Sequence, residues 1–294
     1  MIRINRYNVW WMLSGALLIL CAVLLGVASV VDLRVAETFY LPGNPFSMIG
    51  DIVGKAVGFW VMGGAFVLLY TAASARACRD VVFYLRCAIY GAGAIVSFAL
   101  SSLDLLEYCI SSTIVQLAFA GVMGAIESLI VWLIVRNMVD KHEKYRKWAV
   151  ATILCVVLIA VSTLLLKAIW GRVRFEDVIA GKGEFTPWYR IARQGGDSMP
   201  SGHTILSCAI MMFVPLAWVP EVSSKLRASF LVAGFLFIGM IAASRVLAGK
   251  HYLSDVMMSA LVGGMIVTLT TRFSFGADLS KLEFRKDGFA DRWV

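Results

Sequence analysis

The chain has 294 residues, of which 60% are hydrophobic, and its mean hydropathy is +0.81. These values lie far outside the range of an ordinary soluble domain and predict an integral membrane protein. The formal net charge of +8 comes from basic residues between the apolar runs, so it gives no support to nucleic-acid binding.

The first half of the chain predicts four membrane-spanning helices. Its apolar runs cover about residues 9–31, 52–73, 82–103 and 110–135, and each is long enough to cross a bilayer. The first run is longer than a signal-peptide core and is not followed by a clear cleavage site, so we expect it to be retained. We expect a polar loop over residues 32–51 and a short acidic turn with Asp104 and Glu107.

Two features inside these runs are of interest. Gly54 and Gly58 form a small-xxx-small pair, which predicts close approach of another helix. Glu127 lies in the fourth run, where an uncompensated carboxylate costs several kcal/mol, so it should face the bundle, pair or be protonated. A functional role for Glu127 is left open.

The second half predicts four further spans, at about 148–169, 203–219, 226–243 and 253–271. The longest polar segment, 170–199, carries aromatic residues at 185–189, which either line a lipid entrance or anchor the loop. The predicted fold is therefore an all-α bundle of about eight transmembrane helices. We divide it into N-terminal helices (1–147), a C-terminal core with an interfacial loop (148–272) and a basic tail (273–294). The tail either lies on the inner leaflet or is solvated.

Eight spans place both termini on the same side of the membrane. Basic residues are frequent in the segments on that side and scarce in the loops at 32–51 and 104–109, so the positive-inside rule predicts that both termini are cytoplasmic. We expect a multi-pass protein of the inner or plasma membrane. Residues near 167–203 and 245–255 then lie on the outer, periplasmic or exterior, face.

The segment from Ser244 to Asp255 concentrates polar chemistry. His251 and Asp255 are four residues apart, which on a helix places imidazole and carboxylate one turn apart on the same face. A carboxylate can orient the ring and stabilise its cation while the other nitrogen stays reactive. The alternative is a satisfied polar pair at a helix end. Arg245, six residues earlier, offers a planar fork for phosphate oxygens.

Two more segments supply complementary groups. Ser201 and Gly202 open an apolar run and offer a hydroxyl and free backbone N–H groups to an anion. His203 beside them can donate a proton to a leaving group. The preceding run ends with three cations, Lys167, Arg172 and Arg174. Whether Arg172 contacts the substrate is left open.

In this order the residues resemble the three-part signature of the type 2 phosphatidic acid phosphatase superfamily. The three parts are Lys167 with Arg174 after six residues, then Pro200-Ser201-Gly202-His203, then Ser244-Arg245 with His251 and Asp255. The resemblance covers roughly the last half of the chain. One departure is Phe175, which stands where the family usually has proline, and we expect a changed loop with retained chemistry.

The resemblance implies a membrane phosphatase that forms a phosphohistidine. In this reading the catalytic residues are the nucleophile His251, the orienting Asp255 and the proton donor His203. The phosphate is bound by Lys167, Arg174, Ser201, Gly202 and Arg245. We expect no metal and no cofactor, because the cations can stabilise the phosphoryl charge.

The implied substrate is a lipid phosphate whose chain lies in the bilayer. The motifs do not distinguish undecaprenyl pyrophosphate, phosphatidylglycerophosphate, phosphatidic acid and lipid A, and the sequence does not indicate an oligomeric state. A lipid phosphotransferase using the same intermediate is the alternative. A transporter without chemistry is the third reading, although the charges lie at helix ends rather than mid-membrane.

Overall fold

The computed structural model describes residues 6–75, 79–136, 142–216 and 224–290, and all regular secondary structure in these ranges is helical. The predicted all-α fold is confirmed. The helices are α1 (Arg6–Phe39), α2 (Pro45–Ser74), α3 (Val81–Cys109), α4 (Thr113–Val135), α5 (His142–Trp170), α6 (Phe175–Ile179), α7 (Gly202–Ser207), the 3-10 helix η2 (Cys208–Met212), α8 (Phe213–Leu216), α9 (Ser224–Leu247) and α10 (Leu253–Ala290).

The polytopic membrane bundle is also confirmed. Among the described residues, 7 helices are long and apolar enough to cross a membrane. The sixth predicted span is different, because its described part, Gly202–Leu216, is shorter and is interrupted by η2. The last residues predicted for that span, 217–219, lie outside the described residues.

Several helices extend beyond the apolar runs, so two predicted loops are largely helical. The helix α1 continues to Phe39 and α2 begins at Pro45, which leaves little of the expected loop at 32–51. The N-terminus of α2 is well specified, because Asn44 accepts a hydrogen bond from the Ser47 N–H and proline occupies the first turn. The expected acidic turn with Asp104 lies inside α3. Three of the charged residues in these extensions form ion pairs with distant parts of the chain: Asp32 with Arg172, Asp51 with Arg245, and Asp104 with Lys55.

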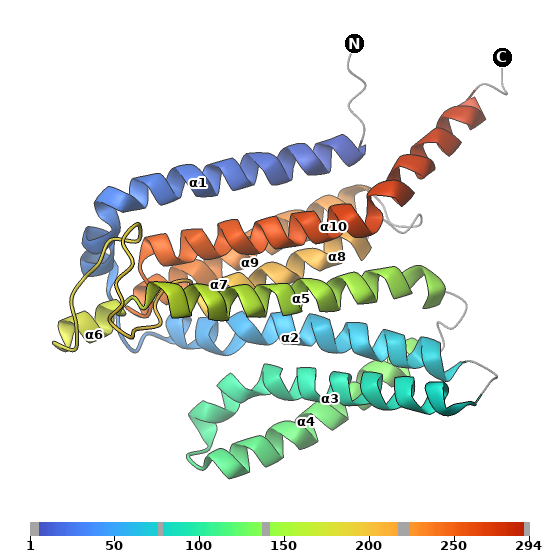
Figure 1. The fold of residues 1–294 in the computed structure, drawn as a ribbon, viewed down its shortest axis with the longest axis horizontal. Coiled ribbons are helices and arrows are strands. Elements are labelled where there is room, and N and C mark those ends of the chain that lie inside the picture. Colours follow the sequence, from blue (N-terminus) through green and yellow to red (C-terminus); the bar gives the residue numbers. More distant parts are fainter. Residues whose placement is uncertain (1–5, 76–78, 137–141, 217–223, 291–294) are drawn as a thin grey trace.

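The helix α2 is central to the packing. It packs against α5, α7 and α9, and also against α3, which forms a hairpin with α4 (Figure 1). The helix α1 lies along α10. Thus α1 and α2 pack on the C-terminal helices, whereas α3 and α4 lie at the edge of the bundle. Glu127, on α4, has one buried carboxylate oxygen without a hydrogen-bond partner in the described part of the chain.

A glycine ridge on α2, formed by Gly50, Gly54 and Gly58, explains its close contacts. A Cβ on Gly54 would lie 2.9 Å from the Cβ of His203, and one on Gly58 would lie 2.8 Å from the carbonyl oxygen of Leu206. A Cβ on Gly50 would lie 2.0 Å from the Oγ of Ser244. The predicted close approach at Gly54 and Gly58 is therefore present, and it brings α7 and α9 directly against α2.

Candidate active site

The loops that carry the three motifs meet at one end of the bundle. The end of α5, the segment with α6, the start of α7 and the turn between α9 and α10 all lie at this end (Figure 1). The first turns of α2 and the last turns of α3 lie there too. Residues separated by long stretches of sequence can therefore form one site.

His251 lies in the turn between α9 and α10 and is only 3% exposed. Its Nδ1 is 2.6 Å from the carbonyl oxygen of Ser198. A carbonyl only accepts hydrogen bonds, so Nδ1 carries the proton and Nε2 of the neutral ring keeps its lone pair. Burial lowers the pKa of His251, and the charges of Lys167 and Arg174 act in the same direction, while Asp255 opposes them. The ring is thus held neutral, with one nitrogen fixed.

Asp255 is not the closest partner of the His251 ring. Its Oδ2 is 3.8 Å from Nδ1 of His251, whereas it accepts hydrogen bonds from the Ser198 hydroxyl at 2.6 Å and the Tyr252 N–H at 2.8 Å. We expected the carboxylate to fix the ring directly. In the structure, Asp255 holds the residues on both sides of the ring, and the Ser198 carbonyl makes the short contact.

Arg172 forms a fully buried ion network beneath this turn. Its guanidinium lies 2.7 Å from Asp32 of α1 and 2.6 Å from Asp255 of α10, and it donates a hydrogen bond to the Ser254 hydroxyl at 2.7 Å. The ring of Tyr252 lies over the guanidinium, with 4.0 Å between Cζ and the ring centroid. With two carboxylates and no exposed surface, Arg172 is committed to the fold and is not available to a substrate.

Lys167 and Arg174 share one carboxylate, that of Asp197. The Asp197 Oδ2 is 3.2 Å from Nζ of Lys167 and 2.8 Å from a guanidinium nitrogen of Arg174. Burial alone would raise the pKa of Asp197, but the two cations outweigh it and hold the pKa below its usual value. Asp197 is half exposed, so an incoming phosphate can compete for both cations.

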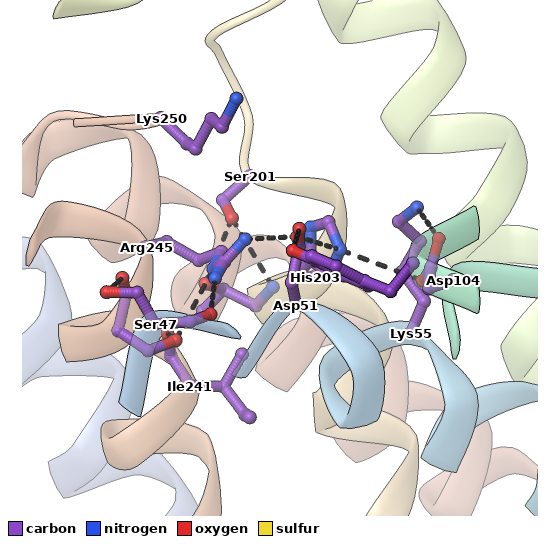
Figure 2. Close-up of polar contacts among 12 residues, drawn as sticks. Ser47, Asp51, Lys55, Asp104, Ser201, His203, Ile241, Arg245 and Lys250 are labelled. Atoms are coloured by element: carbon purple, nitrogen blue, oxygen red, sulfur yellow. Dashed lines mark hydrogen bonds and ion pairs between the residues drawn. The ribbon is translucent and has the colours of Figure 1, made fainter. Parts of the chain in front are cut away.

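Arg245 and His203 share a second carboxylate, that of Asp51 on α2 (Figure 2). Nε2 of His203 is 3.0 Å from Oδ1 of Asp51, and the same oxygen forms an ion pair with the Arg245 guanidinium. Arg245 also donates hydrogen bonds to the carbonyl oxygen of Ser47 and to the Ser244 hydroxyl. Its side chain is only 2% exposed, so it binds a phosphate by giving up a partner. Unlike the buried carboxylates around Arg172, Asp51 is 27% exposed and can be displaced. The predicted proton donor and the predicted phosphate-binding arginine therefore contact one anion from a helix that carries no motif.

Ser201 and Gly202 lie at the start of α7. Ser201 is the N-cap residue, and its Oγ accepts a hydrogen bond from the Thr204 hydroxyl at 3.1 Å. Because Ser201 Oγ acts as an acceptor there, its own hydrogen is free to bind an anion. This geometry fits the predicted role of the serine hydroxyl.

Phe175 occupies the first position of α6, after Arg174 in an extended conformation. Proline is common at the first position of a helix. Here α6 begins at that position with phenylalanine, so the helix forms without proline. The ring is 4% exposed and packs edge-on against Tyr40 and Tyr252. The substitution thus adds an aromatic contact beneath the His251 turn.

The aromatic segment at 185–189 is anchored to the bundle. The Trp188 indole donates a hydrogen bond to the Ser29 hydroxyl of α1 at 2.8 Å, and Phe185 packs on Tyr252. Of the two readings left open from sequence, these contacts favour anchoring.

Sequence reasoning singled out Asp255 but missed three other carboxylates of the site, those of Asp32, Asp51 and Asp197. Asp51 and Asp32 were expected in a loop, and Asp197 was not singled out. Asp32 and Asp51 have one sequence signal, which is their place at the edge of a long apolar run, whereas Asp197 lies inside the polar segment 170–199 and lacks that signal. Their partners are 23 to 194 positions away in sequence, so no local pattern reveals the pairing.

In the described ranges no group of three or more His, Cys, Asp or Glu side chains is arranged to hold a metal ion. In a comparison with protein families, residues 146–278 fit the sequence model of the PAP2 superfamily. The matched segment contains every residue of the three motifs. No curated protein and no solved structure matches the chain.

Proposed function

The segment 146–278 belongs to the PAP2 superfamily, and from this premise we propose that the protein hydrolyses lipid phosphates through a phosphohistidine at the outer face of a membrane. The family supports a phosphatase activity in general, with a phosphorylated lipid or small molecule as substrate. The observation that carries the specific proposal is the state of His251. Its Nδ1 is fixed by the Ser198 carbonyl, and no residue in the described part of the chain hydrogen-bonds to Nε2.

The first step is attack of His251 Nε2 on phosphorus. The N–P bond forms as the bond from phosphorus to the lipid oxygen breaks, and His203 gives its proton to that oxygen. Lys167, Arg174 and Arg245, with the Ser201 hydroxyl and the Gly202 N–H, bind the equatorial phosphoryl oxygens. Asp255 stabilises the positive ring from 3.8 Å and keeps its surroundings fixed.

The second step is hydrolysis of the phosphohistidine. A water molecule attacks phosphorus, His203 takes its proton as a base, and the N–P bond breaks to regenerate neutral His251 and inorganic phosphate. Both steps use groups present in this chain, so we propose that the reaction needs no metal. The charge of three cations replaces the charge that a divalent ion would supply.

The location of the site suggests how a lipid reaches it. The site lies at one end of the apolar bundle, so a phosphate can sit among the cations while the hydrocarbon chain stays in the bilayer. The basic inner segments support an orientation with both termini in the cytoplasm and the site on the periplasmic or exterior side of the plasma membrane. Candidate substrates are undecaprenyl pyrophosphate, phosphatidylglycerophosphate, phosphatidic acid and lipid A.

The test is phosphate release by the detergent-purified protein from a panel of these lipids, with EDTA present throughout. We expect release from at least one lipid by the native protein and none by His251→Ala. Transfer of labelled phosphate to a second lipid, without free phosphate, would instead make the protein a phosphotransferase. Activity that disappears in EDTA and returns with a divalent ion would contradict metal independence.

The orientation has its own test. Single cysteines are introduced into the protein at positions in the 182–193 loop or in the 136–147 segment. Intact cells that express each variant are then labelled with a membrane-impermeant maleimide. Labelling of the first group and protection of the second is expected. The reverse pattern would place the site in the cytoplasm.

A further inference from the structure

We propose that Asp51, on α2, is a positioning residue of the active site that holds His203 and Arg245 in one fixed arrangement. The inference rests on the function proposed above, since it assigns Asp51 to the same reaction. It adds a residue that lies outside the segment 146–278 matched by the family, on a helix without a motif.

One carboxylate joins two groups with different tasks. Oδ1 of Asp51 is 3.0 Å from Nε2 of His203 and also forms the ion pair with Arg245. In Figure 2 the carboxylate lies between the imidazole and the guanidinium, with Ser47 holding the far side of the arginine fork. The contact with Nε2 is an ion-pair contact, because Nε2 of His203 makes no hydrogen bond in the described part of the chain. Asp51 therefore acts on a protonated His203 through its charge.

The Asp51 carboxylate is itself held in place. Its second oxygen, Oδ2, accepts a hydrogen bond from the Tyr108 hydroxyl of α3 at 2.8 Å. The backbone beneath it is fixed by the glycine ridge, because Gly50 and Gly54 contact Ser244 and His203 on either side of Asp51. The carboxylate is thus oriented from both α2 and α3.

The contacts of Asp51 with Arg245 and His203 are costly to break because the side chains are largely buried. The side chain of Arg245 is 2% exposed and that of His203 is 13% exposed, while Asp51 is 27% exposed. A buried guanidinium that loses its carboxylate must reorient or draw in water, because an unpaired buried charge is costly. Displacement of a reacting or binding group by about 1 Å can lower a rate about 100-fold.

The other charged groups near His203 leave Asp51 as the effective partner. Asp104 of α3 has an oxygen 3.8 Å from Nε2, but its other oxygen forms an ion pair with Lys55 of α2 at 2.7 Å (Figure 2). Lys55 therefore offsets the charge of Asp104. Arg245 of α9 is repelled by a protonated His203, and Asp51 separates the two.

The test compares Asp51→Asn, which keeps the shape and removes the charge, with the native protein and with Asp51→Glu. The matched control is Asp177→Asn, which removes the ion pair between Asp177 of α6 and Lys182 in the loop that follows and touches no motif side chain. For each protein kcat/KM is measured with a lipid alkyl phosphate and with p-nitrophenyl phosphate. The nitrophenolate leaving group needs no proton, so this pair isolates the contribution of His203.

For Asp51→Asn we expect kcat/KM to fall about 100-fold on the alkyl phosphate and about 10-fold or less on p-nitrophenyl phosphate. Asp51→Glu should recover part of the loss, and Asp177→Asn should match the native protein. Equal losses on the two substrates, or values within about twofold of native, would overturn the proposal. A rise in activity would also overturn it, since Asp51 would then be an inhibitory anion.

Two further experiments distinguish a failure of this inference from misfolding of the variant and from a failure of the proposed function. If Asp51→Asn does not yield monodisperse protein, Tyr108→Phe is used, and an unchanged ratio between the two substrates counts against the proposal. If the native protein releases phosphate from no substrate, the proposed function fails. Asp51 is then judged by orthovanadate protection against thermal unfolding, where weaker protection in Asp51→Asn supports positioning of Arg245 and equal protection overturns it.

Discussion

The Nδ1 atom of His251 lies 2.6 Å from the carbonyl oxygen of Ser198, while the carboxylate of Asp255, four residues along the chain, lies 3.8 Å from the same nitrogen. The ring is therefore oriented by a backbone atom of a distant loop. Asp255 acts on that loop by accepting a hydrogen bond from the Ser198 hydroxyl.

His203→Ala is expected to trap the phosphohistidine. With p-nitrophenyl phosphate the first step needs no acid, but hydrolysis still lacks its base, so the intermediate should accumulate. We expect a burst of one nitrophenolate per enzyme followed by a steady rate at least about 100-fold below native. Phosphorylation should map to His251 by mass spectrometry at alkaline pH. Label on any other residue would refute the nucleophile assignment.

The acidic limb of the pH profile should lie lower than an ordinary histidine would give. Burial lowers the pKa of His251, and attack requires the neutral ring, so activity is retained below the usual value of about 6.5 and is lost only as pH falls through the depressed pKa. The profile of kcat/KM reports the free enzyme. A half-maximal point at or above pH 6.5 on the acidic side would contradict this.

Arg172→Ala is expected to destabilise the fold rather than act on substrate binding. It leaves Asp32 and Asp255 buried without their cation, which costs about 3–5 kcal/mol. The melting temperature in detergent should drop clearly. Lys182→Ala, which removes an exposed ion pair, should change stability by at most about 1 kcal/mol. A melting temperature for Arg172→Ala equal to that of Lys182→Ala would show that the buried network contributes little.

Gly54→Ala tests the glycine ridge. The added methyl would lie 2.9 Å from the Cβ of His203 and 3.0 Å from Ile241, so α2 and α7 must separate at a cost of about 1–3 kcal/mol. We expect the loss of kcat, expressed as a free energy, to exceed the loss in the free energy of unfolding, because the shift displaces His203. The matched control is Gly64→Ala on the same helix, where a Cβ meets nothing within 4 Å. Equal activity of the two variants would mean that the contact at Gly54 is not critical.

The sequence predicted the all-α membrane bundle because long apolar runs admit few alternatives. It also singled out His203, Arg245 and His251, since such residues are rare in an apolar chain and their spacing is specific. It did not predict how they are held. Asp51 and Asp32 begin or end apolar runs, and a hydropathy argument assigns charges there to loops. In the structure each lies within a helix and pairs with a distant cation, Asp32 with Arg172 in the segment after α5 and Asp51 with Arg245 of α9, and that information is present only in the fold.

The sixth predicted span shows the same limitation. Its apolar composition predicted a regular helix from His203, yet η2 interrupts it at Cys208–Met212. The tight contacts of Leu206 and Cys208 with glycines of α2 and α10 depend on neighbouring helices, which a single run of sequence does not reveal.

The glycine ridge gives α2 an unusual sensitivity to register. Asp51 and Lys55 are four residues apart and project from successive turns of the same face. A slide of α2 by one turn, about 5.4 Å, would replace the anion beside His203 with a cation. Gly54 and Gly58 would take the places of Gly50 and Gly54, but Met62 would have to fit against Leu206 where Gly58 now lies. The sign of the local electric field at His203 is thus set by the position of α2 along its own axis. The capped N-terminus at Asn44 and the contact of Ser47 with α9 hold this position fixed.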